Sequence, residues 1–287
     1  MKRLLVTGAS GFMGSRVVDF YQGKYEICAP GHRELDITDE AGVISGLRDL
    51  RPDYVVHCAA ISDIGQCERE PERSWRINVD GAVNLAKASA LVGAKCLLCS
   101  SDQVYCASAV KGPHRETEKV APGNLYGREK LIAEEKCLEA NPDCVHLRLS
   151  WMYDARTLNE KEHSDFLRTL LTRIRTSETL RYSTGDLRGI TDVNEVAEHL
   201  EAALSLKGGA YNFGSPNTKS MYDTAHSLFE KLGWDTGRLA KEEGAYGGNP
   251  RDLTMSQEKL NGEGIYFMDT EERLLRCIRA AIQDGKT

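Results

Sequence analysis

The sequence predicts an α/β fold in which helices cover both faces of a doubly wound parallel sheet. Three observations predict it: short apolar runs alternate with helical patterns up to about residue 150, a glycine-rich turn follows the first apolar run, and the alternation weakens afterwards. Strands that alternate with helices at this spacing form parallel βαβ units. We therefore expect a Rossmann-like domain over residues 1–150, to which some later segments return, and a smaller α+β lobe over residues 151–287.

Apolar periodicity locates the elements of the first half. Residues 3–7 form an apolar run that ends at a glycine, and residues 11–21 place Phe12, Val17 and Val18 on one side of a helix. Asn141-Pro142 ends the last helix of this half, because proline cannot continue it. Further strands are expected at residues 24–29, 54–58, 95–100 and 144–149, and further helices at residues 39–50, 79–91 and 126–140.

The second half has fewer strand signals. Thr191 or Asp192 stands where a helix N-cap is expected. A loop rich in glycine and charge is predicted at residues 241–250, and a short strand at residues 211–213. The predicted helices are residues 166–176, 191–206, 221–232 and 270–282.

Composition and charge exclude several function classes. A net charge of −6 argues against nucleic acid as the main partner. No apolar run approaches the roughly 20 residues that span a bilayer, so we expect no membrane segment. The apolar run after Met1-Lys2-Arg3 is only Leu4-Leu5-Val6, which is too short for the core of a secretory signal.

Cysteine and histidine usage predicts reduced thiols and no metal site. The nine cysteines are odd in number and scattered, which is typical of a cytoplasmic protein without a disulfide framework. Cys96 and Cys99 form a C-x-x-C inside an apolar run with no second pair to complete a zinc site, so we expect a structural role. The seven histidines are dispersed, and residues 160–163 show no ligand pattern.

A glycine-rich turn is the first functional signal. Gly8-Ala-Ser-Gly11-Phe-Met-Gly14 follows the first strand and opens the first helix, where free N–H groups and the helix dipole favour a dinucleotide pyrophosphate. Glycine lets the backbone approach the phosphates and lets the helix pack on the strand. An ordinary tight turn is the alternative, but the flanking strand and helix favour a dinucleotide. The residues predicted to contact it here are Gly8, Ser10, Gly11, Phe12, Met13 and Gly14.

The end of the second strand predicts which nicotinamide cofactor binds. NAD sites usually have an acidic residue there to bond the ribose 2′-hydroxyl, whereas this chain has Cys28-Ala-Pro-Gly-His32-Arg33 and no carboxylate before Glu34. His32 and Arg33 are placed to meet a 2′-phosphate, unless Arg33 is only a solvated loop charge. We therefore expect NADPH, with NADH as the alternative. Asp36, followed by Ile37, is a candidate adenine contact or a turn residue.

Tyr126 and Lys130 lie one helical turn apart on the same face of a predicted helix. Free tyrosine titrates near pH ~10, and a neighbouring ammonium is expected to lower that pKa. Such a tyrosine can protonate a carbonyl oxygen as hydride arrives, and Lys130 could also bond the nicotinamide ribose. Ser101, at the strand end where open α/β sheets bind ligands, is the predicted third member. A surface Tyr-Lys pair and a turn serine are the alternatives.

In this order the motifs resemble the extended short-chain dehydrogenase/reductases: Gly-x-x-Gly-x-x-Gly, then Ser-Ser-Asp-x-Val-Tyr, then Tyr-x-x-x-Lys. Further segments across nearly the whole chain resemble the dTDP-4-dehydrorhamnose reductase family. They are His32-Arg-Glu-Leu-Asp-Ile-Thr-Asp39, Arg51-Pro-Asp-Tyr-Val-Val-His-Cys-Ala-Ala60, Cys67-Glu-Arg-Glu-Pro71, Asn78-Val-Asp-Gly-Ala-Val-Asn-Leu-Ala86, Leu147-Arg-Leu-Ser-Trp-Met-Tyr153 and Asn249-Pro-Arg-Asp-Leu253.

The resemblance implies an activity and a set of roles. It implies NADPH-dependent reduction of the C4 ketone of a dTDP-linked 4-keto-6-deoxysugar, with Ser101, Tyr126 and Lys130 as the catalytic residues. The nucleotide sugar would be the main partner, bound mainly by the second lobe, and a homodimer stays open. Further cofactor contacts would be Cys58, Ala59, Ala60 and Asn78, joined by Tyr126 and Lys130. Substrate contacts would be Ser62, Asp102, Gln103, Trp151 and Arg251, although Trp151 could serve core packing and Arg251 could be a surface charge.

The chain also departs from the family pattern. Where the reductases commonly have Ser-Thr-Asp-Tyr-Val-Phe, this chain has Gln103 and Tyr105, and Cys106-Ala107 replaces the following Asp-Gly. Arg188-Gly-Ile-Thr191 stands in place of a later Gly-Ser-Pro-Thr. These changes affect the predicted identity of the sugar nucleotide more than the predicted reaction. Two alternatives remain: an epimerase or dehydratase of the same superfamily, and a regulatory protein like the β subunit of methionine adenosyltransferase.

Overall fold

The computed structural model describes residues 1–158, 165–176, 178–245 and 250–283. Residues 160–163, residues 246–249 of the predicted loop, and Asn249 of the Asn-Pro-Arg-Asp-Leu segment lie outside the described residues. All nine cysteines are free thiols. Within the described residues, no helix combines the length and apolar character needed to cross a membrane.

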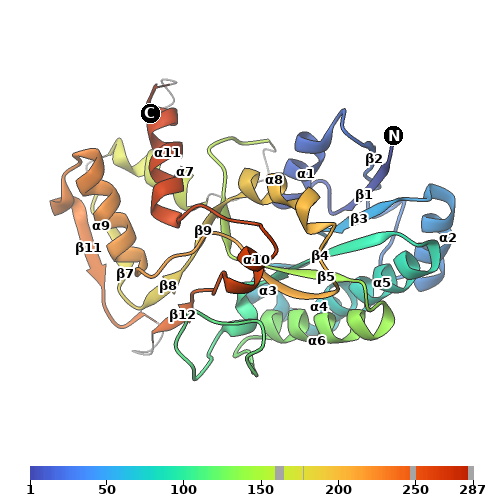
Figure 1. Cartoon of the computed structure of the whole chain (residues 1–287). Helices are drawn as coiled ribbons and strands as arrows, with labels where there is room; N and C mark the ends of the chain where they lie inside the picture. Colours follow the sequence, from blue (N-terminus) through green and yellow to red (C-terminus); the bar gives the residue numbers. More distant parts are fainter. Residues whose placement is uncertain (159–164, 177, 246–249, 284–287) are drawn as a thin grey trace. The chain divides into compact units, whose positions relative to one another are not determined.

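A six-stranded sheet runs in the order β10-β5-β4-β3-β1-β2 (Figure 1). Its strands are β1 (Arg3–Thr7), β2 (Glu26–Cys28), β3 (Tyr54–His57), β4 (Lys95–Ser101), β5 (Val145–Leu149) and β10 (Gly209–Phe213), of which β1 to β5 pair in parallel. The predicted doubly wound sheet is confirmed. The chain leaves β1 for β2 and returns to β3 on the other side of β1, so the winding reverses between β1 and β3. Ligands of open α/β sheets bind at the carboxyl ends of strands at such a point.

Helices cover both faces of this sheet. Figure 1 shows α1 (Phe12–Tyr21) on one face and α2 (Glu40–Leu50), α5 (Gly81–Val92) and α6 (Leu125–Ala140) on the other. The apolar core beneath the second group joins strand residues to helix residues, among them Leu5, Val55, Leu98, Leu47 and Leu85. These elements match the predicted ones to within about three residues at each end, because each has a clear apolar stripe.

The segment between β3 and α5 was not predicted as structured. It contains α3 (Ile64–Arg69), α4 (Pro71–Trp75) and the π-helical η1 (Arg76–Asp80), which runs directly into α5. The side chain of Asp63 caps α3, and Pro71 begins α4, a position where its missing N–H costs nothing. Single turns rich in Glu and Arg carry no helical stripe, which explains the miss. π-Helical turns inside α-helices are rare, and those that occur are often at functional sites.

The chain forms two compact units. The first comprises Met1–Val104, Val120–Leu149 and Ala197–Tyr211, and the second comprises Tyr105–Lys119, Ser150–Val196 and Asn212–Thr287. One segment of the second unit begins at Ser150. The chain also crosses between the units at residues 105–119 and 197–211.

The second unit is built on short parallel strand pairs: β6 (Trp151–Tyr153) with β9 (Ile190–Asp192), β7 (Leu180–Ser183) with β11 (Leu239–Glu242), and β8 (Asp186–Arg188) with β12 (Arg251–Leu253). The sequence predicted none of these six strands, because three or four residues give too little alternation. The prediction that a loop begins at residue 241 is wrong, because Lys241 and Glu242 are the last two residues of β11.

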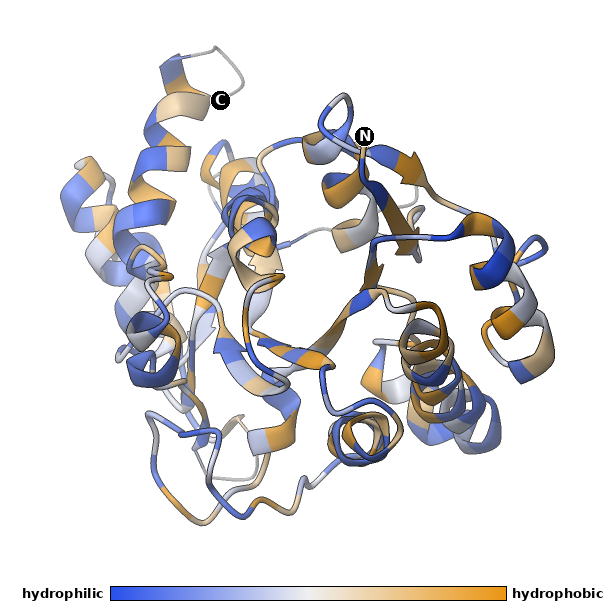
Figure 2. Cartoon of the chain, turned by 45° about the vertical axis from the view of Figure 1, so that its right-hand side comes forward, coloured by the Kyte–Doolittle hydropathy of each residue, from blue (hydrophilic) through white to orange (hydrophobic). Residues whose placement is uncertain are grey.

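Helices of the second unit agree better with the predictions at α7 (Phe166–Ile174), α9 (Met221–Leu232) and α11 (Thr270–Gln283). The short α10 (Glu258–Gly262) was not predicted. Figure 2 shows α11 at the C-terminus with alternating hydrophilic and hydrophobic bands, and its Leu274 and Ile278 are fully buried in the core of this unit. Helix α8 (Val193–Ala203) begins after β9, and the expected cap residue Asp192 accepts from the Asn194 backbone N–H at 2.9 Å.

Two buried histidines make stability depend on pH. Burial lowers the pKa of His57, on β3, to about 3, and the pKa of His146, on β5, to about 4. His57 contacts the Thr7 hydroxyl at 2.7 Å and so links the carboxyl ends of β1 and β3. Between pH ~6.5 and these values the unfolded chain binds protons that the folded chain does not. Stability therefore falls as pH falls through this window.

We predict that His57→Gln flattens this dependence. The wild type should lose up to about 1.4 kcal/mol per pH unit for each titrating histidine below pH ~6, and the variant should lose about half as much. Urea denaturation at pH 7, 6 and 5 measures the slope. His226→Gln, at a half-exposed position on α9, is the control. Equal slopes in the wild type and His57→Gln would contradict the prediction.

Candidate active site

A cavity of about 750 Å³ opens at the carboxyl ends of β1 and β3. This is the switch point of the sheet, where ligands of such folds bind. The cavity is lined by residues that follow β1, β2 and β3 in the chain. Among the predicted cofactor contacts, it is lined by Gly8, Ser10, Gly11, His32, Asp36, Ile37, Cys58, Ala59 and Ala60.

The glycine turn is packed so tightly that side chains would not fit. Gly8 has φ +68°, and a Cβ there would lie 2.6 Å from the Ala59 nitrogen. A Cβ on Gly14 would lie 2.2 Å from the Gly8 carbonyl oxygen. Gly11 is the N-cap of α1 and brings no side chain to the free N–H groups of its first turn. The turn therefore presents bare backbone donors to the cavity, which suits a pyrophosphate.

The part of the cavity that follows β2 is lined by His32. Arg33 is exposed and lies outside the lining. The first carboxylate after β2, on Glu34, accepts from the Gly31 backbone N–H at 2.7 Å. Asp36 accepts from the Thr38 backbone N–H and hydroxyl at 2.9 and 2.8 Å, and these bonds hold the pKa of its carboxyl below the ordinary value.

Two further arginines, Arg73 and Arg76, line the same cavity, and the sequence did not predict them as site residues. They come from α4 and η1, which the sequence did not predict either. Their spacing of three residues, one turn apart just before Asn78, is the signal that could have indicated a shared face. Arg76 also lies close enough to Asp36 to lower the pKa of that carboxyl.

Asn78 supports the cavity wall from behind. It is buried, and its carboxamide accepts from the Ile61 backbone N–H at 2.8 Å and donates to the Ile61 carbonyl at 3.0 Å. Its amide also donates to Glu129 of α6 at 2.7 Å, and Glu129 accepts from Ser74 at 2.5 Å. Ile61 lines the cavity, so Asn78 fixes the wall to α6. The other predicted cofactor residues outside the lining are Phe12, Met13, Gly14, Tyr126 and Lys130.

The three predicted catalytic residues meet at the end of β4. Ser101 ends β4, Tyr126 lies in the first turn of α6, and Lys130 follows one turn later. The Ser101 hydroxyl lies close enough to the Tyr126 phenol to act on its pKa. The Lys130 ammonium donates to the Cys99 carbonyl at 2.8 Å and lies 5.7 Å from the centroid of the Tyr126 ring. All three side chains are at least nine-tenths buried.

Burial sets the electrostatics of this group. Burial raises the pKa of Tyr126 above the ordinary value. The nearby Ser101 side chain lowers this pKa, and the charge of Asp102 raises it further. Burial also lowers the pKa of Lys130. The expected lowering of the tyrosine pKa is therefore not found, because desolvation of the phenolate outweighs the stabilising groups around it.

The predicted substrate residues fall into both units. Ser62 is exposed after β3, while Asp102 and Gln103 are buried at the end of β4. In the second unit, Trp151 keeps 38% of its surface exposed, and the Arg188 guanidinium lies 5.4 Å from the centroid of its ring. Arg251 is held in a bidentate ion pair with Asp186 at 3.0 and 2.7 Å.

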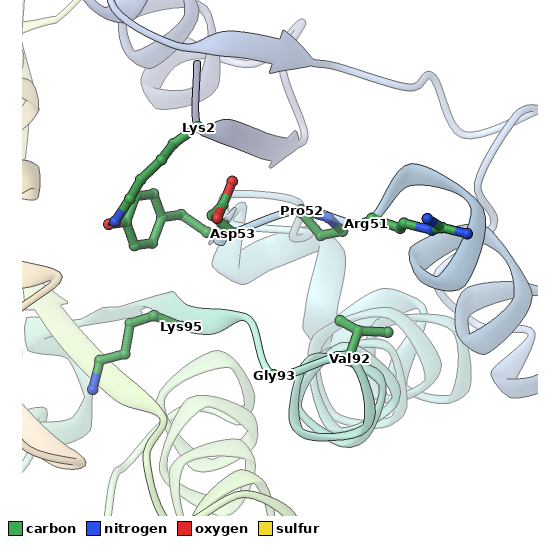
Figure 3. Close-up of a pocket in the computed structure, with 8 residues that line it drawn as sticks. Lys2, Arg51, Pro52, Asp53, Val92, Gly93 and Lys95 are labelled. Carbon is green, nitrogen blue, oxygen red and sulfur yellow. The ribbon is translucent and has the colours of Figure 1, made fainter.

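A second hollow, of about 470 Å³, lies at the opposite ends of the same strands (Figure 3). Lys2, Asp53 and Lys95 line it, and Figure 3 shows Lys95 directed away from Arg51. The Lys95 ammonium donates to the carbonyls of Asp143 and Leu206 at 2.9 and 2.7 Å. Amino ends of parallel strands are not where open α/β sheets bind ligands, so we assign this hollow no part in the site.

No cluster of three or more His, Cys, Asp or Glu suited to a metal ion occurs within the residues that the structure describes.

Comparison with known proteins gives consistent relatives. The family model described as RmlD substrate binding domain matches residues 1–280. A dTDP-4-dehydrorhamnose reductase of Mycolicibacterium smegmatis is 31% identical over 83% of this chain and 72% of its own. The structure of dTDP-4-dehydrorhamnose reductase from Bacillus anthracis in complex with NADP matches with a TM-score of 0.82, at 26% identity and 96% coverage of both chains. Methionine adenosyltransferase 2 subunit beta of Pongo abelii is 36% identical over 53% of this chain and 47% of its own.

We predict that Glu129→Leu destabilises the protein by about 2 kcal/mol, because it removes a buried acceptor from Asn78 and leaves the Ser74 hydroxyl only the Pro71 carbonyl at 3.1 Å. Glu129→Gln should cost less than about 1 kcal/mol, since its carbonyl can accept from Asn78 and its amide can donate to Ser74. Urea denaturation at pH 7 measures both. Equal losses in the two variants would show that these hydrogen bonds do not matter.

Proposed function

The chain belongs to the RmlD substrate binding domain family, and we propose that it is an NADPH-dependent reductase of dTDP-rhamnose biosynthesis. It would reduce the C4 ketone of a dTDP-linked 4-keto-6-deoxysugar. One observation carries the proposal: Ser101, Tyr126 and Lys130 are buried together next to the dinucleotide cavity. The link to the cavity is Cys99, which accepts from Lys130 and whose sulfur lies 3.7 Å from that of Cys58 in the cavity wall.

The residues of the cavity fit a nicotinamide dinucleotide. Gly8 and Gly14 leave the turn free of side chains where the pyrophosphate would lie over α1. Arg73 and Arg76 supply positive charge to the cavity, and the His32 side chain lies in the part that follows β2. Such charge suits a 2′-phosphate better than a free 2′-hydroxyl. When bound, NADPH supplies the hydride.

Tyr126 is proposed as the proton donor to the ketone oxygen. Its raised pKa keeps the phenol protonated at neutral pH, which is the form that donates a proton during reduction. Ser101, close to Tyr126, would hold the same ketone oxygen and orient it toward the phenol. Lys130, anchored on Cys99, would hold the nicotinamide ribose and place its ammonium where the phenolate develops. Burial of all three excludes water that would weaken these interactions.

The alternatives have less support. The similarity to the β subunit of methionine adenosyltransferase covers 53% of this chain, against 83% for the mycobacterial reductase. The full catalytic set is present as well, which a protein acting only as a regulatory partner does not need. An epimerase or dehydratase would recycle its nicotinamide, so it would retain NAD through purification and oxidise no NADPH in net turnover.

We predict that Tyr126→Phe lowers kcat on dTDP-4-dehydrorhamnose by about 10²- to 10⁴-fold, because it removes the proton donor. The dissociation constant for NADPH should change little. Absorbance at the NADPH band measures turnover, and fluorescence titration measures binding. Tyr25→Phe, at a half-buried position just before β2 where the hydroxyl donates to Glu201, is the control. Undiminished turnover in Tyr126→Phe would refute the assigned role.

We predict that His32→Ala and Arg76→Ala each raise the KM for NADPH about tenfold while leaving the KM for NADH nearly unchanged, because only NADPH has a 2′-phosphate for these groups to bind. Arg33→Ala tests the residue favoured by the sequence but placed outside the cavity lining. Steady-state kinetics with both cofactors measures the selectivity. If Arg33→Ala alone raises the KM for NADPH, then Arg33 binds the 2′-phosphate, and His32 and Arg76 in the cavity lining do not.

A further inference from the structure

Gln103 is a buried carboxamide whose side chain contacts protein groups on both sides. It is 5% exposed and stands directly after Ser101 and Asp102, in the first turn of η2 (Asp102–Tyr105). Its amide donates to Asp102 Oδ1 at 3.3 Å, and its backbone N–H donates to Ser101 Oγ at 3.2 Å. Its carbonyl oxygen accepts from the amide of Asn124 at 3.1 Å. The side chain thus spans from the end of β4 to the start of α6.

Asn124 is the N-cap of α6, which fixes the direction of this bond. Its backbone is extended, and its Oδ1 accepts from the Gly127 N–H at 2.7 Å. The oxygen of Asn124 accepts from the cap, and its NH₂ group donates to residue 103. The carboxamide of Gln103 supplies the acceptor for this donor, which an apolar side chain of the same size would not.

The first turn of α6 also rests on the backbone of Gln103. A Cβ on Gly127 would lie 2.3 Å from the Gln103 carbonyl oxygen. Tyr126 is the neighbour of Gly127, and the nearby Ser101 hydroxyl opposes the rise of its pKa. Hydrogen bonds therefore run from Ser101 through Asp102, Gln103 and Asn124 to the first turn of α6, which carries Tyr126.

We propose that Gln103 is a positioning residue, which fixes the start of α6 against the end of β4 and so holds Tyr126 at the distance from Ser101 that proton transfer requires. The proposal rests on the proposed function for its kinetic consequence. It differs from the substrate contact that the sequence predicted, because the carbonyl oxygen and one N–H of the carboxamide are engaged by Asn124 and Asp102.

The test severs the link from either side. Gln103→Met keeps the length of the side chain and removes its hydrogen bonds. Asn124→Ser keeps a good N-cap oxygen and removes the NH₂ donor. With saturating NADPH, each variant should lower kcat on dTDP-4-dehydrorhamnose on the order of 10- to 100-fold, with the KM for the sugar within about twofold, since ground-state binding is not affected. The double variant should be no slower than the slower single variant. Gln22→Met, at the exposed end of α1, is the control and should match the wild type.

A second readout does not depend on turnover. In the NADPH-bound protein with ¹³C-labelled tyrosine, the Tyr126 signal, assigned by its loss in Tyr126→Phe, should titrate at a different pH in Gln103→Met and Asn124→Ser than in the wild type. An unchanged Tyr126 titration in both variants would overturn the proposal. So would a raised KM in Gln103→Met with unchanged kcat and a normal Asn124→Ser, which would make Gln103 a substrate contact. A wild type that reduces no keto sugar would refute the proposed function, while the titration would still decide the role of Gln103.

Discussion

Helix α6 is held in place by charged side chains that it buries, and the candidate site depends on this constraint. Glu129, Lys130 and Glu134 lie on it with no more than 6% of their surface exposed. Burying a charge without a partner costs far more than an ordinary contact returns. Each of the three therefore requires a particular neighbour: Asn78 and Ser74 for Glu129, the Cys99 carbonyl for Lys130, and Arg148 for Glu134.

These four partners lie on different elements, so they fix α6 in several directions at once. Arg148, on β5, forms a bidentate ion pair with Glu134, and Ser100 of β4 donates to the same carboxylate. Burial alone would raise the pKa of Glu134, but the charge of Arg148 and these hydrogen bonds outweigh it and keep the pKa below the ordinary value. Glu129 reaches the opposite way, to η1 and through Asn78 to the cavity wall. The position of Tyr126 thus depends on residues of α4, η1, β4 and β5.

The sequence predicted the parts of this arrangement that leave a local pattern. Long apolar stripes located the five strands β1 to β5 and the helices that cover them, and the spacing of Tyr126 and Lys130 indicated a shared helical face. The strands of the second unit are too short to show alternation, and α3, α4 and η1 have no apolar stripe. Arg76 and Glu129 gain their places only from tertiary contacts. A glutamate within a helix looks like a solvated charge until its neighbours are known, and Glu129 is fully buried.

Position 103 illustrates how two residues can require each other. A ring at this position, as in the family pattern, offers apolar area and at most one hydroxyl, whereas a carboxamide offers one acceptor and two donors. Asn124 uses its oxygen to cap α6, and its half-buried amide donates to the Gln103 carbonyl oxygen. Such a hydrogen bond contributes about 0.5–1.5 kcal/mol, which is comparable to the contribution of the cap itself. Glutamine at 103 supplies the acceptor for Asn124 while its own amide turns back to Asp102. The departure from the family pattern at Gln103 is then explained by the start of α6, independently of which sugar binds.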